Sequence, residues 1–260
     1  MKNKFVNVHI PKTAGSTFGA NLSWAIGDYH GAGYPLINVH SLNKYEFNYE
    51  GYGRTFRELL PQIGEDGARA ITGHYRYQDI SGSLALMRDE VTLVTFVRDP
   101  IMRFISDYYF GSTKRNDGYE DFVSMFSCFE DYMLNDYQLK KQSNFLTPYE
   151  GADIKTVIDN AINNFDFIGI TENFENDFIE LMTAADLDYD LKDNENVNPD
   201  KTEMLRTFEK YKDQLRDVMS EEYELYDAIL EHRNLSHIKS GRSYFTRALG
   251  NFSALFKKDV

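Results

Sequence analysis

The stretch that decides the fold is Phe5-Val6-Asn7-Val8-His9-Ile10, which runs directly into Pro11-Lys12-Thr13-Ala14-Gly15-Ser16-Thr17. Its first part is apolar and β-branched, a pattern typical of a buried strand. The residues that follow predict a tight turn and then the start of a helix. A strand, a loop and a helix N-terminus in this order gather backbone N–H groups, a lysine and two hydroxyls around one point, which suits a phosphate. The stretch therefore predicts an anionic, nucleotide-like ligand.

The spacing within this loop differs from that of a Walker loop. A Walker loop reads G-x-x-x-x-G-K-[ST], with the lysine after the second glycine. Here Lys12 comes first and Gly15 follows it. The alternative is a plain connection between strand and helix, in which Ser16 or Thr17 is the N-cap.

A second segment repeats the same arrangement. Residues 91–97 read Val-Thr-Leu-Val-Thr-Phe-Val, another buried-strand pattern, and Arg98-Asp99-Pro100 follows at once. Proline suits the first helical position, and aspartate suits the N-cap before it. Arg98 then falls at the carboxyl end of a strand, where open α/β sheets bind ligands.

The helix that starts at Pro100 adds a second candidate ligand. Arg103 and Ser106 are three residues apart and share a face of this helix. Arg98 and Ser106 are predicted to hold a second phosphate, with bidentate geometry from the arginine. The alternative is a surface pair of Arg98 and Asp99 beside an ordinary buried helix.

Together the two segments resemble the cofactor loops of sulfotransferases that use 3′-phosphoadenosine 5′-phosphosulfate (PAPS). The resemblance is closest to the carbohydrate (heparan sulfate) 2-O- and 6-O-sulfotransferases, whose 6-O members carry a run similar to residues 9–18. It implies that the first loop holds the 5′-phosphosulfate and that Lys12 is also catalytic. It implies that Arg98 and Ser106 hold the 3′-phosphate. The cofactor-binding residues of the first loop are then Pro11, Lys12, Thr13, Ala14, Gly15, Ser16 and Thr17.

Weaker matches extend the resemblance over most of the chain. They lie at residues 142–146, 167–174 and 225–227, whereas residues 28–66 have no counterpart. The family usually closes a late loop over its cofactor. Asn198, Lys201 and Thr202 are the candidates for that loop here, and an acidic connector before a helix start is the alternative.

A histidine, His74, follows a further predicted strand, which covers residues 69–73. Sulfuryl transfer to an alcohol needs a base for the hydroxyl proton, and histidine is the usual one. In the transferases that this chain resembles, a histidine after this strand has that role, which implies that His74 is the base. If His74 is not the base, Asp79 and Glu46 come forward. His9 lies within the first predicted strand and is expected to be structural, and no histidine spacing predicts a metal site.

Composition favours a single cytosolic enzyme. The 260 residues are enough for one large domain with a substantial core. A single cysteine, Cys128, suits a reducing compartment, and the sequence shows no signal peptide and no run of eighteen apolar residues. We therefore predict a cytoplasmic protein, which departs from the Golgi membrane proteins among the animal relatives.

Charge is unevenly distributed along the chain. Residues 1–115 hold 13 Lys and Arg against 11 Asp and Glu, whereas residues 116–260 hold 15 against 30. Acidic surfaces do not attract polyanions, which excludes nucleic acid as a partner and disfavours a heavily sulfated glycan. The expected acceptor is a neutral or cationic hydroxyl compound, such as a glycan or glycolipid, or an acceptor that is bound by its shape.

The pattern of elements predicts an α/β fold. Strands are expected near 4–10, 69–73, 91–97 and 166–171, and helices near 16–27, 100–113, 131–147, 153–164, 173–185 and 201–232. This alternation predicts a P-loop-like parallel sheet with helices on both faces, in a single domain over residues 1–260. Residues 34–52 and 186–200 are predicted as loops, the first suited to acceptor contacts.

The C-terminal segment has a character of its own. Residues 231–260 are basic and amphipathic, with six Lys or Arg and one acidic residue, Asp259, from His232 onward. A final helix on the protein's own core is one interpretation. The other is docking to an acidic partner, a second copy of the chain or a membrane surface.

Two other function classes stay open at this stage. A P-loop kinase-like phosphotransferase shares the loop and the fold type, but the sequence lacks the G-K-[ST] order and a clear strand-borne aspartate for magnesium. A non-catalytic nucleotide-binding or adaptor protein would keep the fold and bind adenosine 3′,5′-bisphosphate without turnover.

Overall fold

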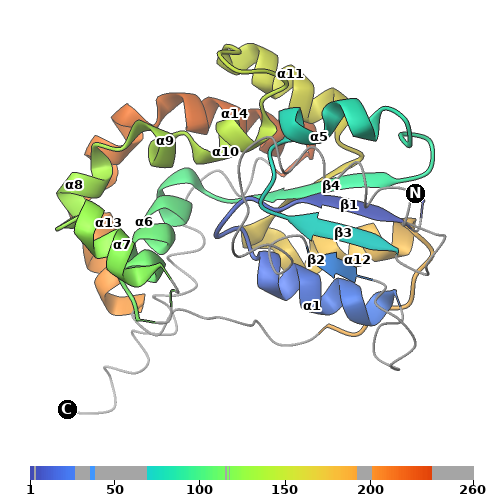
Figure 1. The fold of residues 1–260 in the computed structure, drawn as a ribbon, viewed down its shortest axis with the longest axis horizontal. Helices are drawn as coiled ribbons and strands as arrows, with labels where there is room; N and C mark the ends of the chain where they lie inside the picture. The colour runs from blue at the N-terminus through green and yellow to red at the C-terminus, as the bar shows by residue number, and fades with distance from the viewer. Residues whose placement is uncertain are drawn as a thin grey trace.

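The structure is a computed structural model that describes residues 1–2, 4–26, 36–38, 69–114, 116, 118–191 and 201–235. A twisted sheet forms its centre, helices cover both faces of the sheet, and a further group of helices lies beside it (Figure 1). The predicted α/β fold with helices on both faces is confirmed.

Among the residues that the structure describes, the sheet contains five parallel strands in the order β2-β3-β1-β4-β5. Val8 at the end of β1 is level with Gly73 of β3 on one side and with Thr95 of β4 on the other. The carboxyl ends of all strands therefore lie at one edge. Because β3 and β4 flank β1 on opposite sides, this edge has a topological switch point, the usual ligand site of such sheets. The strands are β1 (Phe5–Val8), β2 (Leu36–Asn38), β3 (Ala70–Gly73), β4 (Thr92–Val97) and β5 (Phe167–Ile170).

Alternation along the strands sends side chains to two separate cores. Phe5 and Phe96 pack against Phe18 of α1 (Gly15–Ala25) and Phe178 of α12 (Phe174–Ala184) on one face. The opposite face is covered by α5 (Tyr77–Leu84), α10 (Lys141–Leu146), α11 (Ile154–Asn164) and α14 (Ser220–His232). Burial on both faces explains why these strands read as continuous apolar runs.

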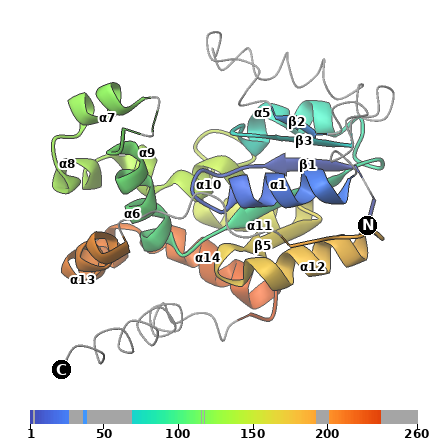
Figure 2. The same cartoon turned by 90° about the horizontal axis from the view of Figure 1, so that it is seen from below.

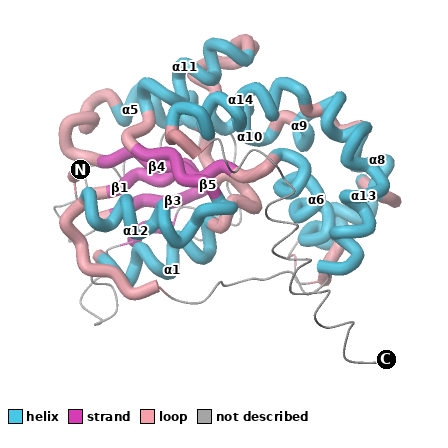
Figure 3. The backbone as a smooth tube through the Cα atoms, turned by 180° about the vertical axis from the view of Figure 1, so that it is seen from behind, coloured by secondary structure: helices cyan, strands magenta, loops and turns pink. Residues whose placement is uncertain are grey.

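A third core lies beside the sheet. Phe104, Phe129 and Tyr132 are central to it, and the rings of Phe104 and Tyr132 are 4.6 Å apart. Figure 2 shows α6, α7, α8 and α13 together at one side of the sheet, and Figure 3 shows α6, α8 and α13 there from another direction. The helices of this group are α6 (Pro100–Gly111), α7 (Tyr119–Met125), α8 (Phe129–Met133), α9 (Asp136–Leu139) and α13 (Lys201–Val218).

Several predicted elements need correction. The segment predicted as a loop at 34–52 contains β2, and the predicted helix 131–147 consists of α8, α9 and α10. The predicted helix 201–232 breaks at Met219 into α13 and α14, and the sequence reading missed α5 and α7. A short 3-10 helix, η2 (Thr171–Asn173), joins β5 to α12.

Some predictions fall outside the described residues. Asn198, Glu46 and residues 236–260 lie there, so the structure does not test the late loop or the C-terminal segment. Lys201 and Thr202 form the start of α13 rather than a loop. In the described parts of the chain, no helix combines the length and apolar character that crossing a membrane requires.

Candidate active site

Three neighbouring strands deliver the predicted site residues to one edge of the sheet. Lys12 follows β1, His74 follows β3 directly, and Arg98 follows β4 directly. Because β3, β1 and β4 are adjacent and parallel, the loops after them meet at the carboxyl edge. The structure therefore brings together the two predicted phosphate loops and the predicted base.

The loop between β1 and α1 is shaped to present backbone donors. Lys12 and Ala14 adopt left-handed conformations, with φ values of 72° and 62°, and the Thr13 hydroxyl donates to the Ile10 carbonyl at 2.8 Å. Ala14 is the N-cap of α1 and offers no capping side chain, and the first turn holds no acidic residue. The alternative in which Ser16 or Thr17 caps the helix is therefore wrong. An uncapped helix N-terminus after such a loop favours an anion.

Gly15 is required by a close approach of His9. A Cβ atom at Gly15 would lie 1.7 Å from His9 Nε2, so any other residue displaces the ring. The His9 and His74 rings are 4.4 Å apart. The expectation that His9 lies within the first strand is wrong, because β1 ends at Val8 and the His9 ring lies against the site. His9 thereby links His74 to the N-terminus of α1.

Lys12 holds a partly desolvated positive charge at this edge. Its Nζ lies 3.8 Å from the centre of the Phe110 ring, on α6. Burial lowers the pKa of Lys12 to about 8, while Asp107 opposes this effect and Arg98 adds to it. Among the described residues no carboxylate forms an ion pair with Lys12. The ammonium group therefore stays available to an anionic ligand.

Arg98 joins the two loops. Its Nη1 donates to the Lys12 carbonyl at 3.1 Å, and its Nε lies 3.8 Å from Oε1 of Glu172. The Arg98 side chain is only 15% exposed and that of Glu172 only 9%. Burial raises the pKa of Glu172 to about 7, an effect that Arg98 opposes and Asp99 reinforces. The protein itself therefore binds part of the Arg98 guanidinium group, and Arg98 in turn holds the first loop in place.

Helix α14 supports the loop between β4 and α6. Asp99 caps α6 as predicted, accepting from Met102 N at 3.0 Å, and it also accepts from the Tyr223 hydroxyl at 3.1 Å. The Tyr226 hydroxyl donates to Glu172 at 3.1 Å, and Glu172 accepts from Asp99 N at 3.2 Å. Tyr223 was not found from the sequence, whereas Glu172 and Tyr226 lie in the weaker resemblance segments.

Gln142 fixes the backbone of Arg98. Its side-chain oxygen accepts from Arg98 N at 2.8 Å, and its side-chain nitrogen donates to Arg98 O at 2.9 Å. Glu222 in turn accepts from the backbone N–H groups of Gln142 and Ser143. The second phosphate loop is therefore held through its main chain from α10 and α14.

The two candidates on α6 differ in their surroundings. Arg103 is fully buried and binds Asp107 at 3.0 Å and the Gln138 carbonyl at 2.6 Å, so it serves the core beside the sheet. Ser106 is buried on the same helix. Within the described chain it forms no hydrogen bond with Lys12 or Arg98. A contact of Ser106 with a phosphate stays a prediction.

Asp79, which the sequence offered as an alternative base, already accepts hydrogen bonds from a neighbouring residue. Asp79 receives hydrogen bonds from Nε and Nη2 of Arg76 at 3.0 and 2.9 Å and from the Arg76 backbone N–H. It closes a capping box at the start of α5. His74 is half-buried at the tip of β3 beside His9. A role of His74 or Asp79 as the base stays a prediction.

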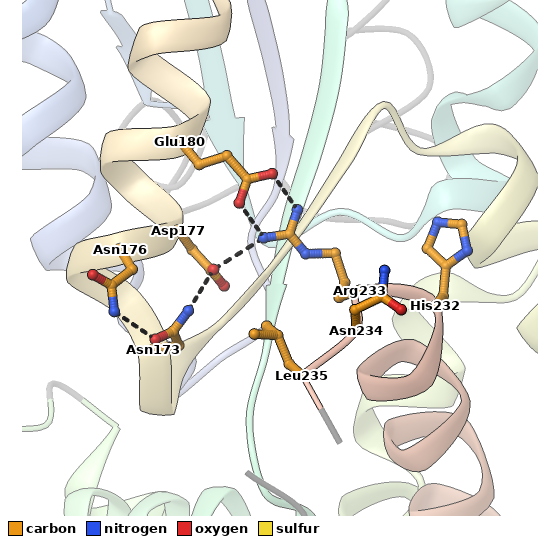
Figure 4. Close-up of a pocket in the computed structure, with 8 residues that line it drawn as sticks. All are labelled: Asn173, Asn176, Asp177, Glu180, His232, Arg233, Asn234 and Leu235. Carbon is orange, nitrogen blue, oxygen red and sulfur yellow. Dashed lines mark hydrogen bonds and ion pairs between the residues drawn. The ribbon is translucent and has the colours of Figure 1, made fainter. Parts of the chain in front are cut away.

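A cavity of about 590 Å³ lies between the first turns of α12 and the end of α14. Figure 4 shows Arg233 turned toward Asp177 and Glu180, with Nη2 distances of 3.0 and 2.8 Å. Asp177 also accepts from Ile170 N at 2.6 Å, so these charges hold α12, α14 and β5 together. The cavity includes none of the predicted site residues.

Comparison with known proteins agrees with the geometry. Among the described residues, no cluster of His, Cys, Asp and Glu suits a metal ion. No curated protein sequence matches the chain significantly. The family model described as the sulfotransferase family matches residues 1–228, which include the loops after β1, β3 and β4. The chain therefore belongs to the sulfotransferase family.

Proposed function

We propose that this sulfotransferase takes its sulfuryl group from PAPS and transfers it to a hydroxyl of a carbohydrate or small-molecule acceptor. One observation carries the proposal. The hydrogen bond of 3.1 Å from Arg98 to the Lys12 carbonyl joins a loop suited to one phosphate to a cation suited to another. A donor with phosphate groups on both the 5′ and the 3′ oxygen of its ribose fits two such neighbouring sites.

The residues present fit such a donor. The uncapped N-terminus of α1, the left-handed residues Lys12 and Ala14 and the ammonium group of Lys12 favour a 5′-phosphosulfate. Among the described residues Nη2 of Arg98 has no acceptor, which leaves it for a 3′-phosphate, with Ser106 as the second ligand. Asn198, Lys201 and Thr202 stay our candidates for residues that close over the nucleotide.

PAPS, when bound, supplies the sulfuryl group. His74 accepts the proton of the attacking acceptor hydroxyl, because a half-buried imidazole at the tip of β3 can act as a general base. Lys12 and the backbone N–H groups of residues 13–17 stabilise the negative charge that grows on the 5′-phosphate as it leaves. The His9 ring lies against both His74 and Gly15, so it fixes the position of His74 relative to the N-terminus of α1.

The charge of the chain supports a proposal for the acceptor, and its cysteine content supports a proposal for the compartment in which the enzyme acts. The acidic second half of the chain disfavours polysulfated glycans and favours a neutral or cationic acceptor, such as a glycan or glycolipid. The single cysteine, Cys128, is free and is compatible with action in the cytoplasm, which we propose as the site of the reaction.

The first test compares three ligands by thermal shift: adenosine 3′,5′-bisphosphate, AMP, and ATP with magnesium. We expect the bisphosphate to stabilise the protein most, by about 2.7 kcal/mol at 100 times its Kd. Arg98→Ala should remove the advantage of the bisphosphate over AMP. Equal shifts from both nucleotides would contradict the 3′-phosphate assignment, and preference for ATP with magnesium would favour a phosphotransferase.

The second test separates binding from chemistry. His74→Ala should lower kcat by roughly 10²–10⁴-fold, the usual contribution of a general base, and leave the Kd of the bisphosphate unchanged. Lys12→Ala should damage both, because its charge acts in the bound state and in the transition state. Full activity of His74→Ala with an identified acceptor would remove His74 from the mechanism, and binding without turnover for any acceptor would favour the adaptor class.

A further inference from the structure

Phe110 stands apart from the other aromatic residues of α6. Phe104, Tyr108 and Tyr109 form ring contacts with one another or with residues of the core beside the sheet. Within the described chain Phe110 contacts no other aromatic ring, and it is 40% exposed. Its ring instead lies under the ammonium group of Lys12, with Nζ 3.8 Å from the ring centre. Packing in the core beside the sheet therefore does not account for an aromatic residue in this exposed position.

The contact suits a lysine that must remain charged and available. A carboxylate partner would neutralise the ammonium group and compete with an anionic ligand. An aromatic face attracts the cation without adding a charge, and the attraction is stronger where the cation is desolvated. Burial is the largest influence on Lys12, as the lowered pKa of its ammonium group shows. An aromatic partner therefore fixes the position and preserves the charge.

The backbone of Lys12 is fixed separately. Its φ of 72° and the hydrogen bond from Arg98 Nη1 to its carbonyl define where the side chain starts. Four flexible methylene groups then separate the backbone from Nζ. Phe110 holds the far end, so Arg98 and Phe110 act on opposite ends of the same residue.

We propose that Phe110 is a positioning residue for Lys12, whose ring holds the ammonium group ready for the 5′-phosphate of the donor. This inference rests on the proposed function, since the donor defines the task of Lys12. Phe110 follows Ser106 by one helical turn and lies on the same face of α6. The face that carries a predicted phosphate ligand thus also orients the lysine.

The contact itself is tested by NMR in the absence of any ligand. The ε-CH₂ protons of Lys12, assigned with Lys12→Arg, should resonate upfield because of the ring current. Phe110→Leu should return them to the ordinary position of a lysine, and Phe110→Tyr should keep them upfield. Ordinary ε-CH₂ shifts in the unmodified protein would overturn the proposal.

The role is tested by affinity for adenosine 3′,5′-bisphosphate. Phe110→Leu should weaken binding about fivefold, whereas Phe110→Tyr should stay within about twofold. In the Lys12→Ala background, Phe110→Leu should have no further effect. The same loss in that background would show that Phe110 acts independently of Lys12 and would overturn the proposal.

A matched control replaces another exposed aromatic residue. Tyr149 is 56% exposed and lies outside the site, so Tyr149→Leu should leave the affinity unchanged. Failure of the proposed function has a different signature: the unmodified protein would not bind the bisphosphate, while the NMR experiment would still decide whether Phe110 holds Lys12.

Discussion

At the scale of single residues, the site depends on Lys12, whose positive charge is destabilised by burial. Burial lowers the pKa of Lys12, and its nearest stabilising group is the Phe110 ring rather than a carboxylate. An anion bound at the N-terminus of α1 would restore the ordinary preference for the charged form. Ligand binding and protonation of Lys12 are therefore coupled.

This coupling predicts that the affinity for adenosine 3′,5′-bisphosphate falls as the pH rises above 8. With a pKa of about 8 in the free protein, Lys12 is charged at neutral pH and neutral in alkaline solution. The ligand binds the charged form better, so above pH 8 each pH unit costs up to about tenfold in affinity. Phosphate groups with a second pKa near 6 are already doubly ionised in this range.

Calorimetry from about pH 7 to about pH 9.5 measures this dependence. Lys12→Arg is the matched control, because a guanidinium group stays protonated throughout and should give a flat profile. A flat profile for the unmodified protein would show that Lys12 does not change its protonation on binding.

Some residues of the site could be predicted from local sequence patterns, and others could not. Lys12, Arg98 and Asp99 were predicted because each directly follows or opens a strongly patterned element. Glu172 contacts Asp99 from 73 residues away along the chain, and Tyr226 contacts Glu172 from 54 residues away. No local spacing encodes such contacts. Only the family resemblance indicated those segments. His9 was misplaced because β1 ends two residues before the apolar run does.

At the scale of elements, prediction succeeded where the pattern was continuous. The strands β1, β3, β4 and β5 are buried on both faces and read as apolar runs. The strand β2 has only three residues and lies in a stretch rich in Gly, Asn and Tyr, so its signal was too short. The break at Met219 has neither Gly nor Pro and no capping side chain, so α13 and α14 read as one helix.

Helix α14 acts as a support for the loop between β4 and α6, and Glu222 is the residue that links it to α10. This buried carboxylate accepts from Gln142 N at 3.1 Å and from Ser143 N at 2.8 Å. Glu222→Gln should destabilise the protein by about 1.5–3 kcal/mol, the typical value of hydrogen bonds to a charged group. Urea unfolding measures the change.

The neighbouring residue provides the control. Glu221 is 55% exposed, and among the described residues its side chain forms only a surface ion pair, with Lys140. Glu221→Gln should therefore change the free energy of unfolding by less than about 1 kcal/mol. Equal effects of the two substitutions would mean that Glu222 does not support α10 in solution.

At the scale of the whole molecule, the negative charge is concentrated in the half of the sequence that follows the two phosphate loops. The chain carries a net charge of −13, and residues 116–260 hold twice as many acidic as basic residues. The third core combines α6, from the nearly neutral half, with α8, α9, α13 and part of α14 from this acidic half. The sequence predicted the charge but not this core, because its aromatic residues come from segments far apart in the chain.

The charge distribution predicts weak binding to polysulfated glycans. A surface of the same sign as the polymer repels it, and near physiological salt only charges within about 8 Å interact appreciably. The protein should therefore pass through a heparin column at about 0.15 M salt and bind to an anion exchanger instead. A variant that ends at His237 lacks residues 238–260, which hold most of the basic residues of the C-terminal segment, and identifies any retention due to them. Retention of both forms on heparin would contradict the inference of a neutral or cationic acceptor, because the site loops themselves would then attract a polyanion.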